Sequence, residues 1–487
     1  MSKISRRQVL GGGSALLIGA GLDGQAQAAP AARGRLRADV CVVGAGYSGL
    51  AAAWQLKKAG AKVIVLEARN RIGGRSLSSG LEGGGWIDLG GQWVGPTQDR
   101  FYDLIKEMGG STYPSPDEGK ALQRGILNAD EFIRIENELA PDSKDGMDLL
   151  QAGFDKIDAI AKGLDPTKPW EHPDAARLDA MTFSEWLRAN VDSENARAMV
   201  GAEVASIACA SPEEISILEI AYLVAACNGL EKLFSGEGGA QQDRLIGGTQ
   251  PIARKLADRL GNVIHLGQPV RRIKWSDKGA IVFSDMVSVA ARHVIVATPP
   301  HLAGAIDYDP SPPTDRVQVT QRWPQGLVIK VAMVYPEPYW RADGLSGASL
   351  CYKSVVGETA DSSVPEQYSR KGIMTGFIYS GQARKVAALP AAQRKKIVLD
   401  EMAQRFGPKA LNPVHYHEMN WSTQQWTRGC FTGFLTPGAT TLFRSAVRDP
   451  VGPLHWAGTE NSTAWPSFIE GAIRSGERAV AEIKTAS

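Results

Sequence analysis

The sequence predicts an α/β protein in which a Rossmann-like domain is joined to a discontinuous α+β domain. Three observations predict this class. Residues 38–75 hold a buried apolar strand, a glycine turn, a helix and a second apolar strand that ends in an acid. A chain of 487 residues is too long for one compact core, which indicates two domains. Residues 113–245 are more helical and more charged than the segments on either side.

The turn at residues 44–49 carries the glycines that a dinucleotide-binding fold needs. Gly44 permits a tight turn, Gly46 lets the backbone approach a pyrophosphate, and Gly49 lets helix and strand pack closely. The N-terminus of the following helix then faces the phosphates. Glu67 ends the second strand, where its carboxylate can bond a ribose hydroxyl. A glycine turn without a ligand is the alternative, and the complete strand–turn–helix–strand–acid context disfavours it.

The loop after Glu67 indicates which dinucleotide is bound. Residues 68–75 end in Gly73-Gly74-Arg75, which resembles the FAD-binding folds of the glutathione-reductase type. The resemblance implies that the small residues lie against the flavin side of the pyrophosphate and that Arg75 adds positive charge. Arg69 and Gly74 are further candidate FAD contacts. The alternative for Arg75 is a solvated loop arginine.

Charge and composition exclude several classes of function. The formal net charge is +2, and Lys3, Arg6, Arg7 and Asp23 of residues 1–28 sum to that value, so the remainder is neutral. A neutral chain offers no general basic field, so no nucleic-acid partner is expected. The seven histidines and five cysteines show no metal-ligand spacing, and no metal site is predicted.

Residues 1–28 have the pattern of a twin-arginine export signal. Arg6 and Arg7 precede an apolar stretch to Leu22, and residues 26–28 form an Ala-Gln-Ala cleavage site. The apolar stretch is too short and too rich in glycine for a membrane anchor, and no second long apolar run follows. We therefore expect a periplasmic or secreted mature protein without a membrane span, starting near Ala29.

Residues 86–98 carry the most specific resemblance. The stretch Trp86-Ile87-Asp88-Leu89-Gly90-Gly91-Gln92-Trp93 is similar to the flavin-containing amine oxidases, the family of the monoamine and polyamine oxidases. In that family this backbone lies against the flavin, where glycines allow close approach. The Gly-Pro-Thr-Gln turn that follows leads into a helix expected at 99–108. The resemblance implies FAD contacts at Leu89, Gly90, Gly91 and Gln92.

The middle of the chain is expected to insert part of a substrate domain. Helices are predicted at 131–139, 143–164 and 189–209, with a capping box from Thr182 to Glu185 and another helix start at Ser211. The chain then returns to the nucleotide-binding domain. It does so with a helix that ends at Leu260 and with strands at 263–266, 269–275, 280–283 and 294–296. In the family, the position of Val270 meets the adenine end of FAD through its backbone.

Lys330 is the first catalytic candidate. Residues 324–330 resemble the family segment that carries the active-site lysine, and Lys330 is expected at the end of an apolar strand. Burying a lysine is costly unless it is bonded or neutral. The resemblance implies that Lys330 holds a water against flavin N5. The alternative is an edge-strand lysine that points to solvent.

Aromatic residues near the C-terminus complete the catalytic set. Trp421 corresponds to the family's tryptophan packed near the flavin, while Phe431 and Phe468 take the two positions of its aromatic cage. The animal enzymes have tyrosine at both cage positions, so this chain lacks two hydroxyl dipoles there. The alternative is that both phenylalanines are ordinary core residues.

The same segments imply further flavin contacts. Thr459 and Glu460 fit FAD contacts, and a helix from about Ser467 would direct its N-terminal dipole at the flavin pyrimidine. Cys430 stands where the animal monoamine oxidases have the cysteine that carries FAD through a thioether. The alternative is a small buried residue that merely fits there.

The resemblance covers residues 38–487 and implies a domain division. The FAD-binding domain is expected at 38–112, 246–318 and 424–487, and the substrate-binding domain at 113–245 and 319–423. The implied reaction oxidises an amine to an imine, which hydrolyses to an aldehyde or ketone plus ammonia or an amine, while dioxygen becomes hydrogen peroxide. The amine, the choice between dioxygen and a periplasmic electron acceptor, and the choice between monomer and homodimer stay open.

Four other functions compete with this interpretation. An L-amino-acid oxidase shares the scaffold but needs an arginine aimed at the substrate carboxylate, for which Arg322, Arg341 and Arg428 are candidates. A carotenoid-type desaturase has the FAD unit but gives no reason for Lys330 and the paired aromatic residues. A non-catalytic flavin-binding protein and a nicotinamide dehydrogenase are the remaining two.

Overall fold

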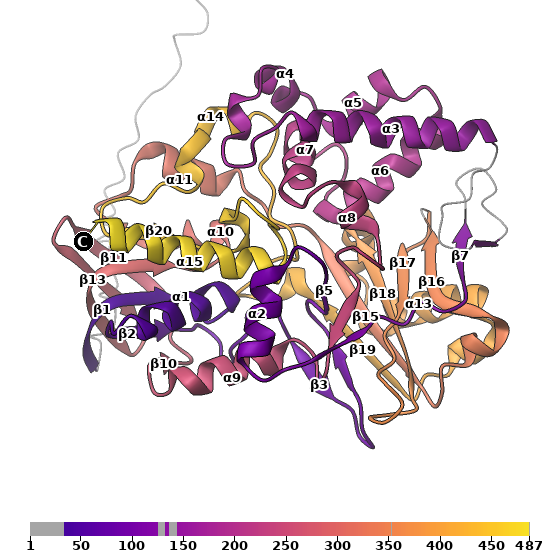
Figure 1. Cartoon of the computed structure of the whole chain (residues 1–487), viewed down its shortest axis with the longest axis horizontal. Helices are drawn as coiled ribbons and strands as arrows, with labels where there is room; N and C mark the ends of the chain where they lie inside the picture. Colours follow the sequence, from indigo (N-terminus) through magenta and orange to yellow (C-terminus); the bar gives the residue numbers. More distant parts are fainter. Residues whose placement is uncertain (1–33, 125–131, 136–143, 352, 487) are drawn as a thin grey trace, which may run out of the picture.

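Two large sheets organise the protein in the computed structural model, which describes residues 34–124, 132–135, 144–351 and 353–486. One sheet has eight strands and the other has seven, and they lie in opposite halves of the molecule (Figure 1). The predicted export signal at 1–28 lies outside the described residues. None of the helices in the described part of the chain is both long and apolar enough to span a membrane.

The eight-stranded sheet forms around β1, which pairs in parallel with β2 on one side and β13 on the other. Along its main path the order is β10-β2-β1-β13-β12-β11-β14, and β20 pairs with β13. The strands of this sheet are β1 (Gly34–Val43), β2 (Val63–Leu66), β10 (Ile264–His265), β11 (Val270–Ser276), β12 (Gly279–Ser284), β13 (Val287–Val296), β14 (Asp307–Asp309) and β20 (Leu454–Trp456).

Helices cover the face of this sheet that carries the glycine turn. They share one hydrophobic cluster with β1 and β2, and they are α1 (Tyr47–Lys58), α2 (Asp99–Glu107), α9 (Gln250–Leu260) and α15 (Ile469–Ala486). Gly476 of α15 sits so close to α1 that a Cβ there would lie 2.2 Å from the carbonyl oxygen of Ser48. The C-terminal helix therefore packs directly over the start of α1 (Figure 1).

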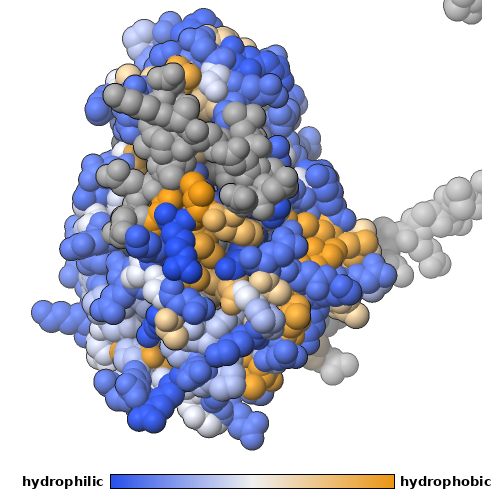
Figure 2. Space-filling model, turned by 90° about the vertical axis from the view of Figure 1, so that its right-hand side faces the viewer, coloured by the Kyte–Doolittle hydropathy of each residue, from blue (hydrophilic) through white to orange (hydrophobic). Residues whose placement is uncertain are grey.

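The seven-stranded sheet is mainly antiparallel, in the order β19-β15-β18-β17-β16-β7-β8. Every residue of β15 is buried, because β15 lies between β18 and β19 and is covered on both faces. The end of the molecule that carries this sheet has a mostly hydrophilic surface, with hydrophobic side chains gathered near its centre (Figure 2). The strands are β7 (Lys120–Arg124), β8 (Ile133–Ile135), β15 (Val328–Tyr335), β16 (Leu345–Cys351), β17 (Glu358–Asp361), β18 (Gly372–Tyr379) and β19 (His415–Asn420).

Short strands and further helices connect these sheets. Two small sheets pair β3 (Ser78–Gly80) with β4 (Trp86–Asp88), and β5 (Trp93–Val94) and β6 (Thr112–Pro114) with β9 (Asp243–Leu245). Helices α12 (Ser380–Ala387) and α13 (Ala391–Phe406) pack against β15 and β18 in one cluster. Helices α10 (Pro300–Ala303), α11 (Thr314–Gln321) and α14 (Ala439–Phe443) lie beside the eight-stranded sheet (Figure 1).

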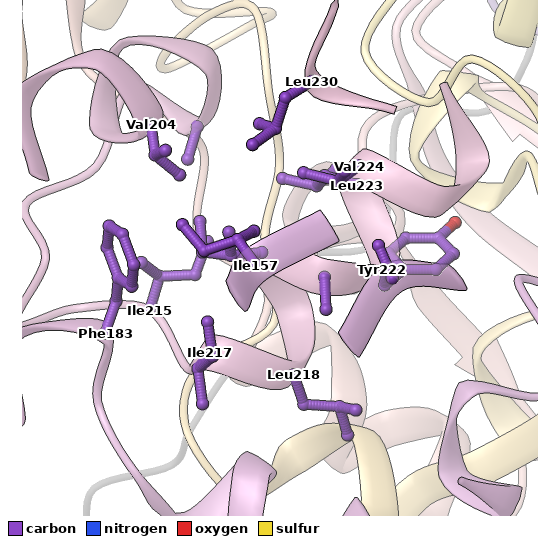
Figure 3. Close-up of a cluster of buried hydrophobic side chains, with 14 of the residues drawn as sticks. Ile157, Phe183, Val204, Ile215, Ile217, Leu218, Tyr222, Leu223, Val224 and Leu230 are labelled. Carbon is purple, nitrogen blue, oxygen red and sulfur yellow. The ribbon is translucent and has the colours of Figure 1, made fainter. Parts of the chain in front are cut away.

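A helical layer lies above the seven-stranded sheet and has its own core (Figures 1 and 3). Ile157, Phe183, Val204 and Ile217 are among the buried side chains that meet there. Tyr222 adds a polar link, since its hydroxyl donates to the carbonyl of Ser462 at 2.6 Å. The helices are α3 (Lys144–Lys162), α4 (Ala175–Ala180), α5 (Phe183–Asn190), α6 (Glu194–Ala208), α7 (Ile217–Ala226) and α8 (Leu230–Phe234).

The predicted elements compare with these bounds as follows. The structure confirms the strand–turn–helix–strand unit, the strands after Leu260 and the helix at 99–108. It also confirms the helix at 143–164 from Lys144 on and the capping box at Thr182. The helix expected at 131–139 is wrong where the structure describes it, because Ile133–Ile135 is a strand paired with β7. Lys330 does not end its strand but is its third residue. The domain boundaries stay a prediction.

Three helix starts also differ. Ser211 begins only a turn, in which the N–H of Glu214 donates to the Ser211 carbonyl at 2.8 Å. The next helix starts at Ile217, with Ser216 as the N-cap that accepts from the N–H of Glu219. The helix expected over 189–209 begins at Glu194, and the one expected from about Ser467 begins at Ile469.

Glu219 on α7 introduces a titratable group into the buried core. Its carboxylate accepts from the N–H of Leu435 at 3.3 Å and from Thr440 Oγ1 at 3.4 Å. Burial raises the pKa of Glu219 from 4.5 to about 8, although the Leu435 hydrogen bond acts in the opposite direction. The folded protein therefore keeps a proton on this acid that the unfolded chain loses near pH 4.5.

The change Glu219→Gln should make thermal stability less dependent on pH. Because the pKa is higher in the folded than in the unfolded state, the wild-type stability falls as the pH rises from about 4.5 to about 8. The fall is at most about 1.4 kcal/mol per pH unit. Melting temperatures of the FAD-loaded wild type, of Glu219→Gln and of the surface control Glu213→Gln check this across the window. Equal slopes for all three proteins would contradict it.

Candidate active site

A single cavity of about 1070 Å³ runs between the glycine turn and the seven-stranded sheet. It contains most of the predicted site residues, and those outside its lining are Gly49, Leu89 and Glu460. The lining residues among the predictions are Gly44, Gly46, Glu67, Arg69, Gly74, Arg75, Gly90, Gly91, Gln92, Val270, Lys330, Trp421, Cys430, Phe431, Thr459 and Phe468. One continuous space thus joins residues predicted to hold a nucleotide to residues predicted to meet a substrate.

The glycine turn brings backbone to the edge of this cavity. Gly44 has φ +105°, and a Cβ there would lie 2.7 Å from the carbonyl oxygen of Ala297. At Gly49 a Cβ would lie 2.0 Å from the carbonyl oxygen of Gly44, so helix α1 starts in direct contact with the turn. Gly46 is the N-cap of α1 and lines the cavity. The positive end of the helix dipole therefore faces the cavity, as phosphate binding requires.

Glu67 and Arg69 form the polar wall next to this turn. The buried Glu67 carboxylate accepts from the N–H of Ala45 at 2.7 Å and from the N–H of Arg69 at 2.9 Å. Each carboxylate oxygen has a second lone pair, so Glu67 can also accept from a ribose hydroxyl. Arg69 Nη1 lies 3.7 Å from Glu67 Oε1, and burial lowers the pKa of Arg69 while Glu67 raises it. Val270 lines the same end of the cavity.

Three buried polar atoms on the cavity wall fit a polar cofactor. Arg69 Nη2, Thr298 Oγ1 and Ser467 Oγ have no hydrogen-bond partner among the described residues, and all three residues line the cavity. Buried polar groups in native proteins are nearly always paired. Together with the glycine turn and the free helix N-terminus, they fit a dinucleotide that extends along the cavity.

Arg75 connects three segments beside the cavity. Its Nη1 donates to the carbonyl of Phe431 at 2.7 Å and lies 2.8 Å from Glu460 Oε1. Gln325 joins the same group, because its Nε2 donates to Glu460 Oε1 at 3.0 Å. Burial alone would lower the pKa of Arg75, but the negative charge of the fully buried Glu460 side chain outweighs this effect. The net shift of the Arg75 pKa is therefore upward. Arg75 lines the cavity as a fixed cation, with Glu460 behind it.

Thr459, next to Glu460, uses its hydroxyl within the chain. Thr459 Oγ1 donates to the carbonyl of Phe468 at 2.8 Å, which holds the start of α15 against this wall. Sequence reasoning gave no role to Gln325, because its only signal was its place within the lysine segment at 324–330.

Lys330 projects into the middle of the cavity wall. It is 3% exposed, and its Nζ donates to the carbonyl of Gly90 at 2.8 Å and to Gln92 Oε1 at 2.5 Å. Burial lowers the pKa of Lys330 from 10.5 to about 7, although Asp88 raises it. The alternative of a solvent-facing edge-strand lysine is wrong, since β15 is an inner strand. Near neutral pH the amine is therefore partly uncharged.

Trp421 fixes the backbone just before this point. Its indole Nε1 donates to the carbonyl of Leu89 at 2.9 Å, and the side chain is 1% exposed. Since Lys330 bonds Gly90 and Gln92, the stretch 89–92 is held by two side chains from the other half of the chain. A Cβ on Gly90 would lie 2.0 Å from the carbonyl oxygen of Arg75, so this backbone approaches the Gly73–Arg75 loop closely.

Phe431 and Phe468 both line the cavity but pack in different clusters. Phe431 packs with Phe377 and Trp421, whereas Phe468 meets Trp465 edge-on with ring centroids 4.9 Å apart. Further aromatic residues on the cavity wall include Trp93, Phe377 and Tyr379, to which sequence reasoning gave no role. Lys330 Nζ lies 5.4 Å from the ring centroid of Phe377 and 6.0 Å from that of Trp93.

An acidic residue lies at the sheet end of the cavity. Glu358 accepts from the hydroxyl of Tyr379 at 2.7 Å, and Tyr379 stacks on Phe377 with ring centroids 5.8 Å apart. Burial raises the pKa of Glu358, although the Tyr379 hydrogen bond lowers it. Glu358 pairs across the sheet with Phe377, two residues before Tyr379. The pairing register of β17 with β18 brings Glu358 to the cavity wall. No sequence pattern predicted this position.

Cys430 is the one cysteine of the chain on the cavity wall. It is 4% exposed and belongs to the cluster of Phe377 and Trp421. Burial raises the pKa of its thiol from 9.0 to about 12, while Arg75 lowers it. Cys430 thus borders the same cavity as Lys330.

The comparisons with known proteins agree on one family. The flavin-containing amine oxidoreductase family matches residues 47–484. The chain is 37% identical over 448 residues to a probable flavin-containing monoamine oxidase A of Dictyostelium discoideum, covering 92% of this chain and 97% of that protein. It is also 37% identical over 458 residues to an L-amino acid dehydrogenase of Synechocystis, covering 91% of this chain and 94% of that protein.

A solved structure shares both the fold and a third of the sequence. Putrescine oxidase bound to putrescine superimposes with a TM-score of 0.89 at 34% identity, covering 93% of this chain and 100% of that chain. The predicted α/β fold class is thereby confirmed, and the family implies a flavin cofactor that the polar wall fits. With nearly the whole chain matched, this protein belongs to the flavin-containing amine oxidoreductase family and is a flavin-dependent amine oxidase.

Proposed function

We propose that the protein uses FAD to oxidise an amine to an imine, with dioxygen as the electron acceptor. The observation that carries this proposal is the buried Lys330 at the point where the polar and aromatic parts of one cavity meet. When bound, FAD accepts a hydride from the amine's α-carbon and passes the two electrons to dioxygen. The imine takes up water and yields an aldehyde or ketone plus ammonia or an amine, and dioxygen becomes hydrogen peroxide.

The residues of the polar wall would hold FAD. The glycine turn and the N-terminus of α1 would bind the pyrophosphate, and Glu67 would accept from the ribose. Val270 would meet the adenine end through its backbone. Arg75, kept charged by Glu460, would stand close to the flavin side of the cofactor. The backbone from Leu89 to Gln92, fixed by Trp421 and Lys330, would bound the flavin ring.

Lys330 would hold a water at the reacting face. Its amine is fixed by Gly90 and Gln92, and it is partly neutral near pH 7. A neutral amine can accept as well as donate a hydrogen bond. It can therefore orient a water in the cavity without placing a full charge beside the apolar substrate wall of Phe431 and Phe468.

A diamine is a second candidate for the substrate class. Glu358 makes its one described hydrogen bond to Tyr379 and has no cationic partner among the described residues. Glu358 is partly buried and lines the cavity, where its carboxylate is poorly solvated, and a substrate ammonium at this position would provide the missing charge. Putrescine, the ligand of one similar structure, is a diamine. The aromatic walls between Lys330 and Glu358 would cover the methylene chain.

The alternative of an amino-acid substrate requires an arginine on the cavity wall that can pair with the substrate carboxylate. Among the three candidates, Arg428 lines the cavity, whereas Arg341 pairs with Asp361 at 2.8 Å and Arg322 packs on Phe443. The similarity to an L-amino acid dehydrogenase keeps this alternative open. A peroxide-release screen over monoamines, diamines and L-amino acids separates the three classes.

We further propose that Cys430 holds FAD through a thioether and that residues 1–28 export the loaded protein to the periplasm. The bond would join the sulfur to the flavin 8α carbon, replacing the thiol hydrogen and one methyl hydrogen. These two hydrogens would leave on dioxygen as hydrogen peroxide. The position of Cys430 on the cavity wall supports the bond, and its raised pKa opposes it. Twin-arginine export carries folded proteins, which suits a protein that loads its cofactor before export.

The change Lys330→Met should leave FAD bound and lower amine turnover about 100-fold or more, the range of general acid–base catalysis. Since the methionine side chain cannot hold the water, the larger loss should fall on reoxidation by dioxygen. Stopped-flow measurements of flavin reduction and reoxidation check this, with the exposed Lys385→Met as the control. Unchanged rates in both half-reactions would remove Lys330 from the mechanism.

The change Glu358→Gln should separate diamines from monoamines. Loss of one charge-assisted hydrogen bond should lower kcat/KM for 1,4-diaminobutane about 10- to 100-fold. The value for n-butylamine, which lacks the second ammonium, should stay within about 3-fold of the wild type. Tyr379→Phe keeps the carboxylate and serves as the matched variant, with a smaller effect expected. An equal loss for both amines would reject the diamine assignment.

Acid precipitation should leave FAD in the wild-type protein pellet, with an FAD adduct on the peptide that contains Cys430. Cys430→Ala should release FAD into the supernatant and keep amine oxidation, because the polar wall still binds the cofactor. Cys351→Ala, which changes a buried cysteine outside the cavity lining, should behave like the wild type. A colourless wild-type pellet would rule out the covalent bond.

A further inference from the structure

A second, smaller cavity of about 330 Å³ lies beside the eight-stranded sheet. Residues of α10, β14, α11 and β20 line it, at the end of the molecule where the chain terminates (Figure 1). Ile306 borders both this cavity and the large one, while Lys330 and the other catalytic candidates border only the large one. The proposed amine oxidation therefore makes no use of this space.

Arg316 places a buried positive charge in the wall of this cavity. The side chain is 4% exposed, and its guanidinium lies 3.9 Å from the ring centroid of Trp456. Nη1 donates to the carbonyls of Ala446 at 3.2 Å and Val447 at 2.8 Å. Among the described residues Arg316 has no carboxylate partner. Burial lowers its pKa from 12.5 to about 10, which leaves the group charged at neutral pH.

The other charges around the cavity are already paired. Asp307 on the rim is largely exposed and faces Arg272 at 3.5 Å. Arg478, whose charge acts on Arg316, pairs with Glu482. Arg272 also pairs with Asp309 at 2.7 Å, so it is shared by two carboxylates. No described carboxylate pairs with Arg316 itself. Since a fully buried charge is rarely left without a partner, this arrangement points to an anion.

The geometry of Arg316 also indicates which anion fits. Both of its hydrogen bonds use Nη1, so Nε and Nη2 donate to no described residue, and neither atom is sealed from the cavity. These two nitrogens form the edge of a guanidinium that binds a carboxylate with two parallel hydrogen bonds. The remaining walls include Ile306, Tyr308, Val317 and Trp456. The side chains of these four residues offer an apolar surface.

We propose that this cavity binds a small monocarboxylate with an apolar tail, whose carboxylate pairs with the Nε and Nη2 edge of Arg316. The tail packs against Trp456 and Val317. A cavity of about 330 Å³ matches the lower end of small-ligand sites. The site is separate from the amine site, so a carboxylate bound here does not displace the amine.

The FAD-loaded protein tests this with 4-fluorobenzoate, followed by ¹⁹F NMR and calorimetry. The wild type should bind the probe, and saturation of the large cavity with an amine under anaerobic conditions should leave that binding unchanged. Arg316→Lys keeps the charge but loses the two-nitrogen edge, so Kd should rise at least about 10-fold. The exposed Arg322→Lys, just past the end of the same helix, is the matched control and should bind like the wild type.

A second variant covers the case in which Arg316→Lys fails to fold. Val317→Phe keeps the arginine and fills part of the cavity, so it should also weaken binding at least about 10-fold. Flavin absorbance and melting temperature establish that each variant is folded. Three results would overturn the proposal. The first is that the wild type does not bind the probe at about 10 mM. The second is that the amine displaces the probe. The third is that Kd is unchanged in those of the variants Arg316→Lys and Val317→Phe that fold.

Discussion

The hydrogen bonds from Lys330 to Gly90 and Gln92 join the two halves of the site. Lys330 lies on an inner strand of the seven-stranded sheet, whereas Gly90 lies beside the Gly73–Arg75 loop that belongs with the glycine turn. Without these bonds the amine would be buried and unpaired, which costs several kcal/mol. The bonds therefore satisfy the lysine and fix the backbone against which a flavin ring can lie. Trp421 strengthens the same junction through Leu89.

Local patterns explain why so much of the nucleotide end could be predicted. Gly44 and Gly49 are required by contacts within a few residues, because any Cβ there would meet nearby backbone. A short sequence motif is enough to record such a requirement. The position of Lys330 came from resemblance rather than from pattern, and its apolar neighbours on both sides were consistent with burial. The strand that holds Lys330 was predicted, but it was expected to end at Lys330 and in fact continues to Tyr335.

Long-range pairing explains what the sequence did not reveal. Glu358 enters the cavity only because β17 pairs with β18 in a register that sets it opposite Phe377, 19 positions along the chain. The strand at Ile133–Ile135 exists because β7 provides its partner, which outweighs the helical propensity of its neighbourhood. Likewise, Ser211 and Ser216 both precede a glutamate by three residues, and only tertiary packing decides that the helix starts at the second.

Some charged groups of this protein are paired within the fold, whereas two that border cavities are not. Arg75 meets Glu460, and Arg244 meets Asp88 at 3.5 Å, so these arginines are compensated within the fold. Glu358 and Arg316 line cavities and have no opposite charge among the described residues. Desolvation destabilises every one of these charges. In the paired groups the opposite charge offsets that cost, whereas the unpaired groups have no such offset within the fold. Glu219 meets the same cost by keeping its proton. Glu358 and Arg316 instead border cavities, where a ligand can supply the missing partner. That reasoning assigns a cation to the cavity beside Glu358 and an anion to the cavity beside Arg316.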